Sequence, residues 1–313
     1  MRFAIGIPQL YPDGSFSPSD FKSYLARVEE LGVFDSAWTQ EMVLGGAPQL
    51  APLEVMTYAA ACTSTLRLGC TVFVTTLHTP VHLAKSLASL DQLSGGRLEV
   101  GIGSGGPRRP FAAFGMSADR WLPRFTEGVA LMKALFTEPS VTFDGEFWQL
   151  KDVAMEPTPY QKPYPRLWFG GSAATAVRRG VGLCDGFFGA GSSATPAFAS
   201  QVSVVRETLA EDPAGRRVGF GPGQFPIAKR VYLGVDPSSG ARARERMNDA
   251  LASMYGARVP AIESAAVAGT VTECVDGVRA VIEAGAEMIL FTPLYDNVEH
   301  MELIADQIIP ALR

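Results

Sequence analysis

Short apolar runs alternate with longer segments of helical periodicity along the whole chain. The apolar runs are bounded by glycine, proline and polar residues, and their length is typical of buried strands. We expect strands near Phe3–Ile7, Ser36–Thr39, Arg67–Val74, Leu98–Ile102, Arg166–Phe169, Gly186–Phe188, Lys229–Val235 and Glu287–Phe291. We expect helices near Ser19–Leu31, Pro52–Thr63, Pro80–Leu93, Asp119–Phe136, Ala173–Val181, Ala197–Leu209, Ser238–Tyr255 and Val271–Ala284, with a last helix over Asn297–Ile309.

Eight strands, each followed by a helix, predict one α/β domain over residues 1–313, a closed (β/α)8 TIM barrel. The strands are apolar on both faces, as parallel strands covered by helices are. An open doubly wound sheet is the alternative architecture. It is disfavoured because Ile7 is followed by Pro8-Gln9 and not by a glycine-rich phosphate turn.

The fourth connection is too long to be a helix alone. Within it, Val141–Leu150 has Asp144-Gly145 between β-prone pairs, which predicts a small hairpin after the fourth strand. Two further segments, Asp212–Pro226 and Gly256–Ala268, are expected to be irregular loops. Long loops at the C-terminal ends of barrel strands usually build the functional site.

Composition and charge exclude several classes of protein. The net charge is −5 and no Lys/Arg run exceeds two residues, so we expect no nucleic-acid partner. The four cysteines form no CxxC and the three histidines are badly spaced for a metal site, so we expect no metal. With no signal-peptide pattern and no apolar run of about 18 residues, we expect a cytoplasmic protein without membrane association.

The segment Leu90–Gly106 carries the most local information. A helix ends at Ser94, two glycines turn the chain, and a buried strand runs directly into Gly103-Ser104-Gly105-Gly106. Glycine has no Cβ and tolerates positive φ, so a ligand can lie against the peptide groups there. A plain glycine-rich turn is the alternative interpretation. The functional one is favoured because a similar loop follows another strand.

That second loop is Phe169-Gly170-Gly171-Ser172, which ends a strand and opens a helix. Free N–H groups and the helix dipole favour an anion at such an end. Ser172 is placed to cap the helix and to donate to a phosphate. A glycine turn with a simple N-cap is the alternative.

These segments together resemble the bacterial-luciferase-like oxidoreductase superfamily, barrels that bind reduced FMN or the 5-deazaflavin coenzyme F420. The motifs that carry the resemblance occur in the expected order over nearly the whole chain: Phe34–Glu41, Arg67–Val72, Leu83-Ala84-Lys85, Leu90–Gly103, Arg166–Ser172, Cys184-Asp185-Gly186 and Ala268-Gly269-Thr270. The resemblance implies an F420-dependent oxidoreductase that transfers hydride to or from a small organic substrate. An FMNH2-dependent monooxygenase acting with molecular oxygen is the alternative. We also expect a homodimer.

The resemblance implies cofactor-binding residues on several strand ends. They are Gln40, Thr71, Val72, Gly103, Ser104, Gly170, Gly171, Ser172 and Ala173. In the deazaflavin branch a non-prolyl cis peptide props the ring, and the matching bond here is Thr71–Val72. The cofactor phosphate is expected at Gly170–Ser172, with the Ala268-Gly269-Thr270 turn as the alternative place.

Two residues compete for the catalytic proton. Many deazaflavin members carry Asp-His where this chain has Gln40-Glu41, so the histidine role does not carry over. Glu41 is the expected proton donor or acceptor. His78, in the loop after the third strand, is the competing candidate, and a solvated loop-end Glu41 is the non-catalytic alternative.

The substrate side is expected to be apolar. The loop 106–116 is expected to line it together with three further aromatic residues. The residues of this wall are Arg108, Arg109, Phe111, Phe114, Met116, Trp121, Phe187 and Phe188. Gly106 stands where some sugar-phosphate dehydrogenases of the branch carry a catalytic Glu, which argues against that substrate class. A serine hydrolase is disfavoured because no GxSxG surrounds Ser104, and a cofactor-free homologue because it would not need the second glycine loop.

Overall fold

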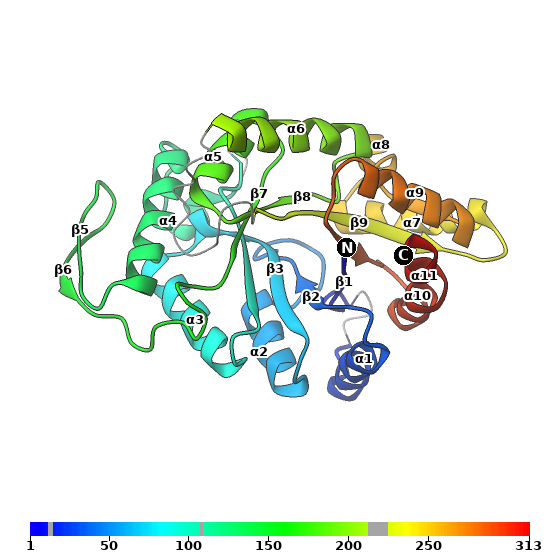
Figure 1. Cartoon of the computed structure of the whole chain (residues 1–313), viewed down its shortest axis with the longest axis horizontal. Coiled ribbons are helices and arrows are strands. Elements are labelled where there is room, and N and C mark those ends of the chain that lie inside the picture. The colour runs from blue at the N-terminus through cyan, green and yellow to red at the C-terminus, as the bar shows by residue number, and fades with distance from the viewer. Residues whose placement is uncertain (12–14, 107–108, 212–224) are drawn as a thin grey trace.

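The computed structural model describes residues 1–11, 15–106, 109–211 and 225–313. Eight parallel strands close into a barrel, which confirms the predicted fold (Figure 1). Around the barrel the strands follow one another in chain order, and the last gap is closed because β8 pairs with β9. The barrel strands are β1 (Arg2–Gly6), β2 (Ser36–Thr39), β3 (Arg67–Val74), β4 (Leu98–Gly103), β7 (Leu167–Gly170), β8 (Gly186–Gly189), β9 (Ile227–Val235) and β11 (Met288–Thr292).

Helices cover the barrel from outside. They are α1 (Pro18–Leu31), α2 (Pro52–Cys62), α3 (Pro80–Leu93), α4 (Trp121–Thr137), α5 (Ala174–Leu183), α6 (Thr195–Glu211), α7 (Gly240–Tyr255), α9 (Val271–Glu283) and α10 (Asn297–Leu303). Local sequence explains several boundaries: Ser17 and Thr79 cap α1 and α3 just before a proline, and Gly32 ends α1 at φ 61°. The predicted last helix is interrupted, because a π-helical stretch separates α10 from α11 (Ile309–Leu312).

The predicted hairpin is present as β5 (Val141–Asp144) and β6 (Gln149–Val153), and it projects from the body of the barrel (Figure 1). The expectation of an irregular Gly256–Ala268 was wrong. This segment contains the short helix α8 (Pro260–Glu263) and the start of β10 (Val267–Gly269), which pairs with the end of β9. Elements this short leave no periodicity to detect. Of the predicted loop Asp212–Pro226, residues 212–224 lie outside the described residues.

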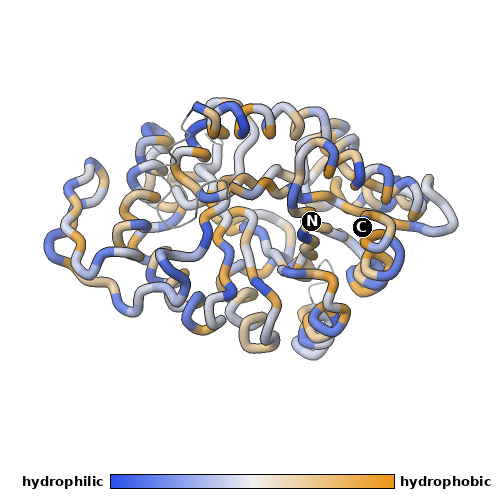
Figure 2. The backbone as a smooth tube through the Cα atoms, in the orientation of Figure 1, coloured by the Kyte–Doolittle hydropathy of each residue, from blue (hydrophilic) through white to orange (hydrophobic). Residues whose placement is uncertain are grey.

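The core has two layers. Between strands and helices lies a large apolar layer, and Figure 2 shows hydrophobic positions along the central strands with hydrophilic ones on the outer helices. The barrel interior is filled by Ala4, Trp38, Trp168, Phe188, Ala228, Met288 and Leu290. Trp38 and Phe188 pack edge to face at 4.8 Å between ring centroids. The barrel is therefore solid below its C-terminal end, and a site has room only at that end.

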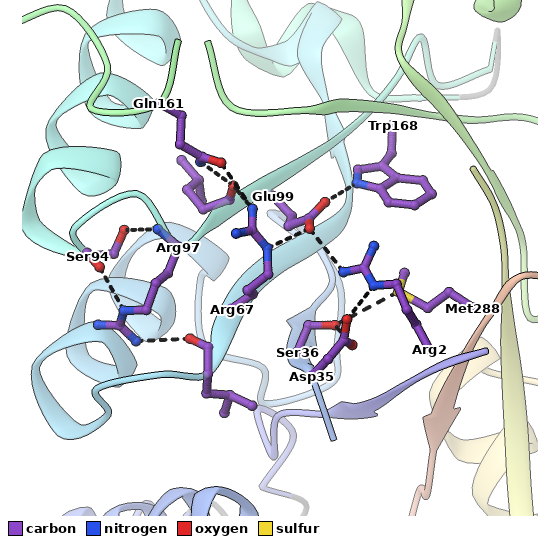
Figure 3. Close-up of polar contacts among 12 residues, drawn as sticks. Arg2, Asp35, Ser36, Arg67, Ser94, Arg97, Glu99, Gln161, Trp168 and Met288 are labelled. Atoms are coloured by element: carbon purple, nitrogen blue, oxygen red, sulfur yellow. Dashed lines mark hydrogen bonds and ion pairs between the residues drawn. The ribbon is translucent and has the colours of Figure 1, made fainter. Parts of the chain in front are cut away.

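A charged cluster occupies the opposite, N-terminal end of the strands (Figure 3). Glu99 accepts hydrogen bonds from Arg67 (2.7 Å), Arg2 (3.1 Å) and the Trp168 indole. Burial alone would raise the pKa of Glu99, but the charges of Arg67 and Arg2 hold it below its ordinary value. This end of a barrel serves stability rather than chemistry. No helix in the described part of the chain is long and apolar enough to cross a membrane.

Candidate active site

A cavity of about 320 Å³ opens at the C-terminal ends of the strands. Seven of the nine predicted cofactor-binding residues line it: Gln40, Thr71, Val72, Gly103, Gly170, Gly171 and Ser172. Glu41 lines it as well. The barrel thus brings together the ends of β2, β3, β4 and β7, which lie far apart in the sequence.

The end of β3 carries a bulge. The register with β4 shifts between Cys70 and Phe73, and the Thr71–Val72 peptide bond is cis, which confirms that prediction. The Val72 side chain occupies the space that a Cβ would need at two neighbouring glycines, Gly103 and Gly170. A Cβ on Gly170 would lie 2.5 Å from Val72 Cγ1, and one on Gly103 would lie 2.9 Å from Val72 Cγ2.

These contacts give a packing reason for glycine in the two loops. A Cβ on Gly103 or Gly170 would collide with Val72, so the bulge by itself requires glycine at both positions. Gly105 has φ +66°, so that position does need glycine for its backbone. The glycines therefore shape the cavity wall mainly by accommodating the bulge.

Ser104 and Ala173 are not among the described residues that line the cavity. Ser104 is buried, its hydroxyl donates to the Gly105 carbonyl at 3.2 Å, and its own carbonyl accepts from Thr76. Gly103 and Gly105, on either side of it, line the cavity. The side chain of Ser104 is thus turned from the site that the sequence predicted for it.

The loop after β7 leads directly into α5. The expected cap is wrong: Ala173, not Ser172, is the N-cap residue, and no side chain caps the helix. Ala173 and Ser172 are exposed, so the backbone N–H groups of the first turn face open space. Behind the loop, the buried Gln201 amide donates to the Ser172 carbonyl and to Ser193 Oγ, both at 3.4 Å, and so joins the loops after β7 and β8.

The alternative phosphate place, at Gly269-Thr270, is already occupied by a carboxylate. Glu273 accepts a hydrogen bond from the Thr270 N–H at 2.7 Å and completes a capping box at the start of α9. Arg244 pairs with the other Glu273 oxygen at 3.1 Å. A second anion there would meet like charge, so the uncapped start of α5 is the better anion site.

Glu41 and His78, predicted as competitors, form one pair. His78 Nε2 lies 2.7 Å from Glu41 Oε1, and the Val74 N–H donates to Glu41 Oε2 at 2.7 Å. The Glu41 side chain is only 3% exposed, whereas the His78 side chain is 24% exposed. Both carboxylate oxygens are thus held in place at the cavity wall, and the imidazole extends the pair outward.

Several cavity residues were missed from the sequence. Arg230 and Tyr232 reach the cavity from β9, and Tyr255 reaches it from α7, with 2.9 Å between the two tyrosine hydroxyls. The signal was available, because Lys229-Arg230 interrupts an otherwise apolar strand. Arg230 faces the cavity, while Lys229 faces outward and donates to the carbonyls of Ala190 and Arg230.

Lys229 is 2% exposed, and burial together with the neighbouring Arg230 charge lowers its pKa to about 7. Its partner Ala190 belongs to the cavity wall after β8. Lys229 therefore supports that loop from behind without reaching the cavity itself.

The expected apolar substrate wall was only partly right. Arg109 and Phe188 line the cavity, but Phe187 points into the outer core, and Arg108 lies outside the described residues. The described wall of the cavity does not include Phe111, Phe114, Met116 or Trp121. With Glu41 and Arg230 also present, the wall carries charges of both signs. A substrate here meets polar recognition as well as apolar contact.

Comparison with known proteins agrees with this barrel and this site. The sequence profile of the family described as luciferase-like monooxygenase matches residues 2–288. The chain belongs to the luciferase-like monooxygenase family. Its relatives include both F420-dependent and FMNH2-dependent enzymes.

Two relatives illustrate this division. The FMNH2-dependent dimethylsulfone monooxygenase of Pseudomonas putida is 31% identical over 153 residues, which cover 48% of this chain and 41% of that protein. The F420-dependent glucose-6-phosphate dehydrogenase of Beutenbergia cavernae is 28% identical over 334 residues, covering 95% and 94%. Several of the other curated relatives align over only about half of their length.

Solved structures share the fold. The monooxygenase RslO1 from Streptomyces bottropensis superposes with a TM-score of 0.83 at 23% identity, and the alignment covers 100% of both chains. An F420-dependent secondary alcohol dehydrogenase gives a TM-score of 0.81 at 19% identity, covering 100% of this chain and 99% of the other. At these identities the similarity concerns the fold alone.

Proposed function

We propose that this protein is a coenzyme F420-dependent oxidoreductase that passes hydride between the deazaflavin and a small organic substrate. The observation that carries the proposal is the Glu41–His78 pair, because Glu41 lines the same cavity as Gly171 and Ser172, the residues that lead into the uncapped start of α5. One part offers a proton-transfer group and the other an anion site, and both stand at the C-terminal end of the barrel.

The residues present fit such a coenzyme. A cavity of about 320 Å³ falls in the range of roughly 300–1,000 Å³ typical of cofactor and ligand sites. The uncapped first turn of α5 suits a phosphate, and the Val72 bulge offers an apolar surface between β4 and β7. When bound, the coenzyme supplies the hydride donor or acceptor.

Within this proposal the chain itself handles the proton. Glu41 Oε1 and His78 Nε2 share a hydrogen bond, so a proton placed on this pair is held at a defined position. The Val74 N–H fixes the second Glu41 oxygen, which keeps the carboxylate from turning away. We assign the pair, rather than one residue of it, the role of general acid or base.

The length of the alignments supports the F420 branch. The similarity to an F420-dependent dehydrogenase extends over 95% of this chain, whereas that to the FMNH2-dependent monooxygenase covers 48% of it. The second candidate function, an FMNH2-dependent monooxygenase, is favoured by the slightly higher identity of the shorter alignment, 31% against 28%.

Side-by-side equilibrium titration of the purified chain with F420 and with FMN tests the proposal. We expect micromolar or tighter binding of F420 and at least tenfold weaker binding of FMN, a difference of about 1.4 kcal/mol. If FMN binds tenfold more tightly than F420, the monooxygenase function takes its place.

A further inference from the structure

Arg230 is a buried cation without an anionic partner. Only 9% of the residue is exposed, its Nε donates to Thr292 Oγ1 at 3.2 Å, and its guanidinium lies 4.9 Å from the centroid of the Tyr232 ring. Over the described ranges of the chain, no carboxylate lies within ion-pair distance of it. The terminal nitrogens of the guanidinium therefore remain available to a ligand.

This arrangement is unusual for an arginine inside a protein. Buried charges are normally paired, because an uncompensated buried charge is costly. The same barrel follows that rule at its other end, where Arg2 and Arg67 both pair with Glu99 although each is about one-third exposed. Arg230 is more buried than either and has no such partner, so we expect its counter-ion to come from outside the chain.

Arg230 stands between two hollows. One is the main cavity with Glu41, and the other is a recess of about 50 Å³ at the ends of β1, β2, β9 and β11. The recess is far below the roughly 300 Å³ needed for a drug-sized ligand, so it suits a small polar group at the end of a larger molecule. A planar carboxylate matches the fork of a guanidinium.

The glutamine side chains around the recess are already engaged, whereas the Asn297 amide makes no side-chain hydrogen bond to another described residue. The Gln9 amide donates to the carbonyls of Gln40 and Leu50, and its oxygen accepts from the Gln40 N–H. The Gln40 side-chain amide donates to Gln49 Oε1 at 3.1 Å. Arg230 is thus the charged donor that the described wall offers to an incoming group.

Position around the barrel assigns this anion to the substrate. The proposed phosphate site follows β7. Of the strands that border the recess, β1 lies four strands away in the closed ring of eight, and β9, which carries Arg230, lies two strands away. A coenzyme anchored after β7 reaches the cavity from that side, so the recess remains for the second reactant.

We propose that Arg230 recognises a carboxylate on the substrate and seats it in the recess between β1, β2, β9 and β11. This inference rests on the proposed function only in taking the main cavity as the place of the coenzyme ring. It defines the substrate class as small organic acids whose reacting carbon lies toward Glu41, on the cavity side of Arg230.

Calorimetric titration with matched probes tests the inference. The full chain, with and without F420, is titrated with acetate and butyrate and with their neutral counterparts acetamide and butyramide. We expect each carboxylate to bind at least tenfold more tightly than its amide. Arg230→Met should abolish this preference and Arg230→Lys should retain part of it, while Arg279→Met, which removes an exposed arginine of α9, should leave it unchanged.

Each remaining outcome has a distinct meaning. Equal binding of carboxylate and amide, or a preference that survives Arg230→Met, overturns the inference. A tenfold loss of F420 affinity in Arg230→Met without any carboxylate preference in the parent chain overturns it in favour of an anionic part of the coenzyme. If Arg230→Met does not fold, Thr292→Val, which removes the acceptor of Arg230 Nε, replaces it and should weaken the preference. If F420 does not bind but the preference for carboxylates over amides persists, the proposed function is wrong and the carboxylate site stands.

Discussion

The start of α5 allows a test in which stability and binding move in opposite directions. Ala173→Asp places a carboxylate at an N-cap position that has extended backbone (φ −73°, ψ 140°) and no side-chain cap. An Asp N-cap stabilises a helix by about 1 kcal/mol relative to Ala. With an unfolding entropy of about 2.1 cal/mol/K per residue, this raises the Tm of a 313-residue chain by about 1.5 °C.

The same carboxylate opposes a phosphate. Two unit charges about 5 Å apart repel by about 3 kcal/mol at an effective dielectric constant of about 20, and solvent screening at the exposed Ala173 reduces this. We therefore expect roughly 10- to 100-fold weaker coenzyme binding. The measurements are thermal unfolding without coenzyme and equilibrium titration with F420, each compared with the parent chain.

Ala51→Asp is the matched control. Ala51 is the N-cap of α2, with φ −69°, ψ 142° and no side-chain cap, and it is not part of the cavity. The Ala51→Asp substitution should raise the Tm by a similar amount and leave coenzyme binding unchanged. An Ala173→Asp chain that is more stable and still binds F420 like the parent would refute the reasoning, because the phosphate would then lie elsewhere.

The remaining predictions concern the other ionisable groups. Glu41→Gln should reduce turnover by roughly 10²–10⁴-fold with little change in F420 affinity. Because Glu41 and His78 act as a pair, adding His78→Ala to Glu41→Gln should lower kcat much less than His78→Ala does alone. Additive losses in kcat would contradict the pairing. Lys229 has its pKa lowered to about 7 from 10.5, so between these pH values the unfolded chain binds the extra proton and stability rises with pH. Urea unfolding from pH 7 to 10 should show the unfolding free energy of the parent rising by up to about 1.4 kcal/mol per pH unit, and that of Lys229→Met should lack this rise. If the unfolding free energies of both proteins change with pH at the same slope, Lys229 stays charged in the fold. Glu99→Gln should destabilise the fold by about 3 kcal/mol at pH 7. Because the pKa of Glu99 is lowered, the difference in unfolding free energy between variant and parent should shrink as the pH falls below about 4.5. A difference that stays constant with pH would rule out the Glu99 charge as the cause.

Gly171 shows why the structure changes the choice of experiment. From the sequence, a larger residue there tests phosphate binding alone. In the fold, a Cβ on Gly171 would lie 2.6 Å from the Phe169 ring, so such a variant disturbs packing as well as binding. Ala173 has no such conflict and is the better position.

The sequence alone determined the barrel and the ends of its strands. β2 and β3 have their predicted limits, because short apolar runs between turn residues report burial on both faces locally. It also pointed to the cavity, because parallel strands in a barrel end on one rim and glycine loops mark those ends. The cis peptide after Thr71 followed from the resemblance and not from the local pattern.

Only the tertiary structure decided how the site is assembled. Glu41 and His78 are 37 positions apart, and their hydrogen bond exists because β2 and β3 are neighbours in register. Gly170 makes room for Val72 from another strand, and Arg230 on β9 lines the same cavity as the loop after β7, two strands away. Such relations depend on the closure and register of the barrel, which place residues side by side at distances that no local pattern encodes.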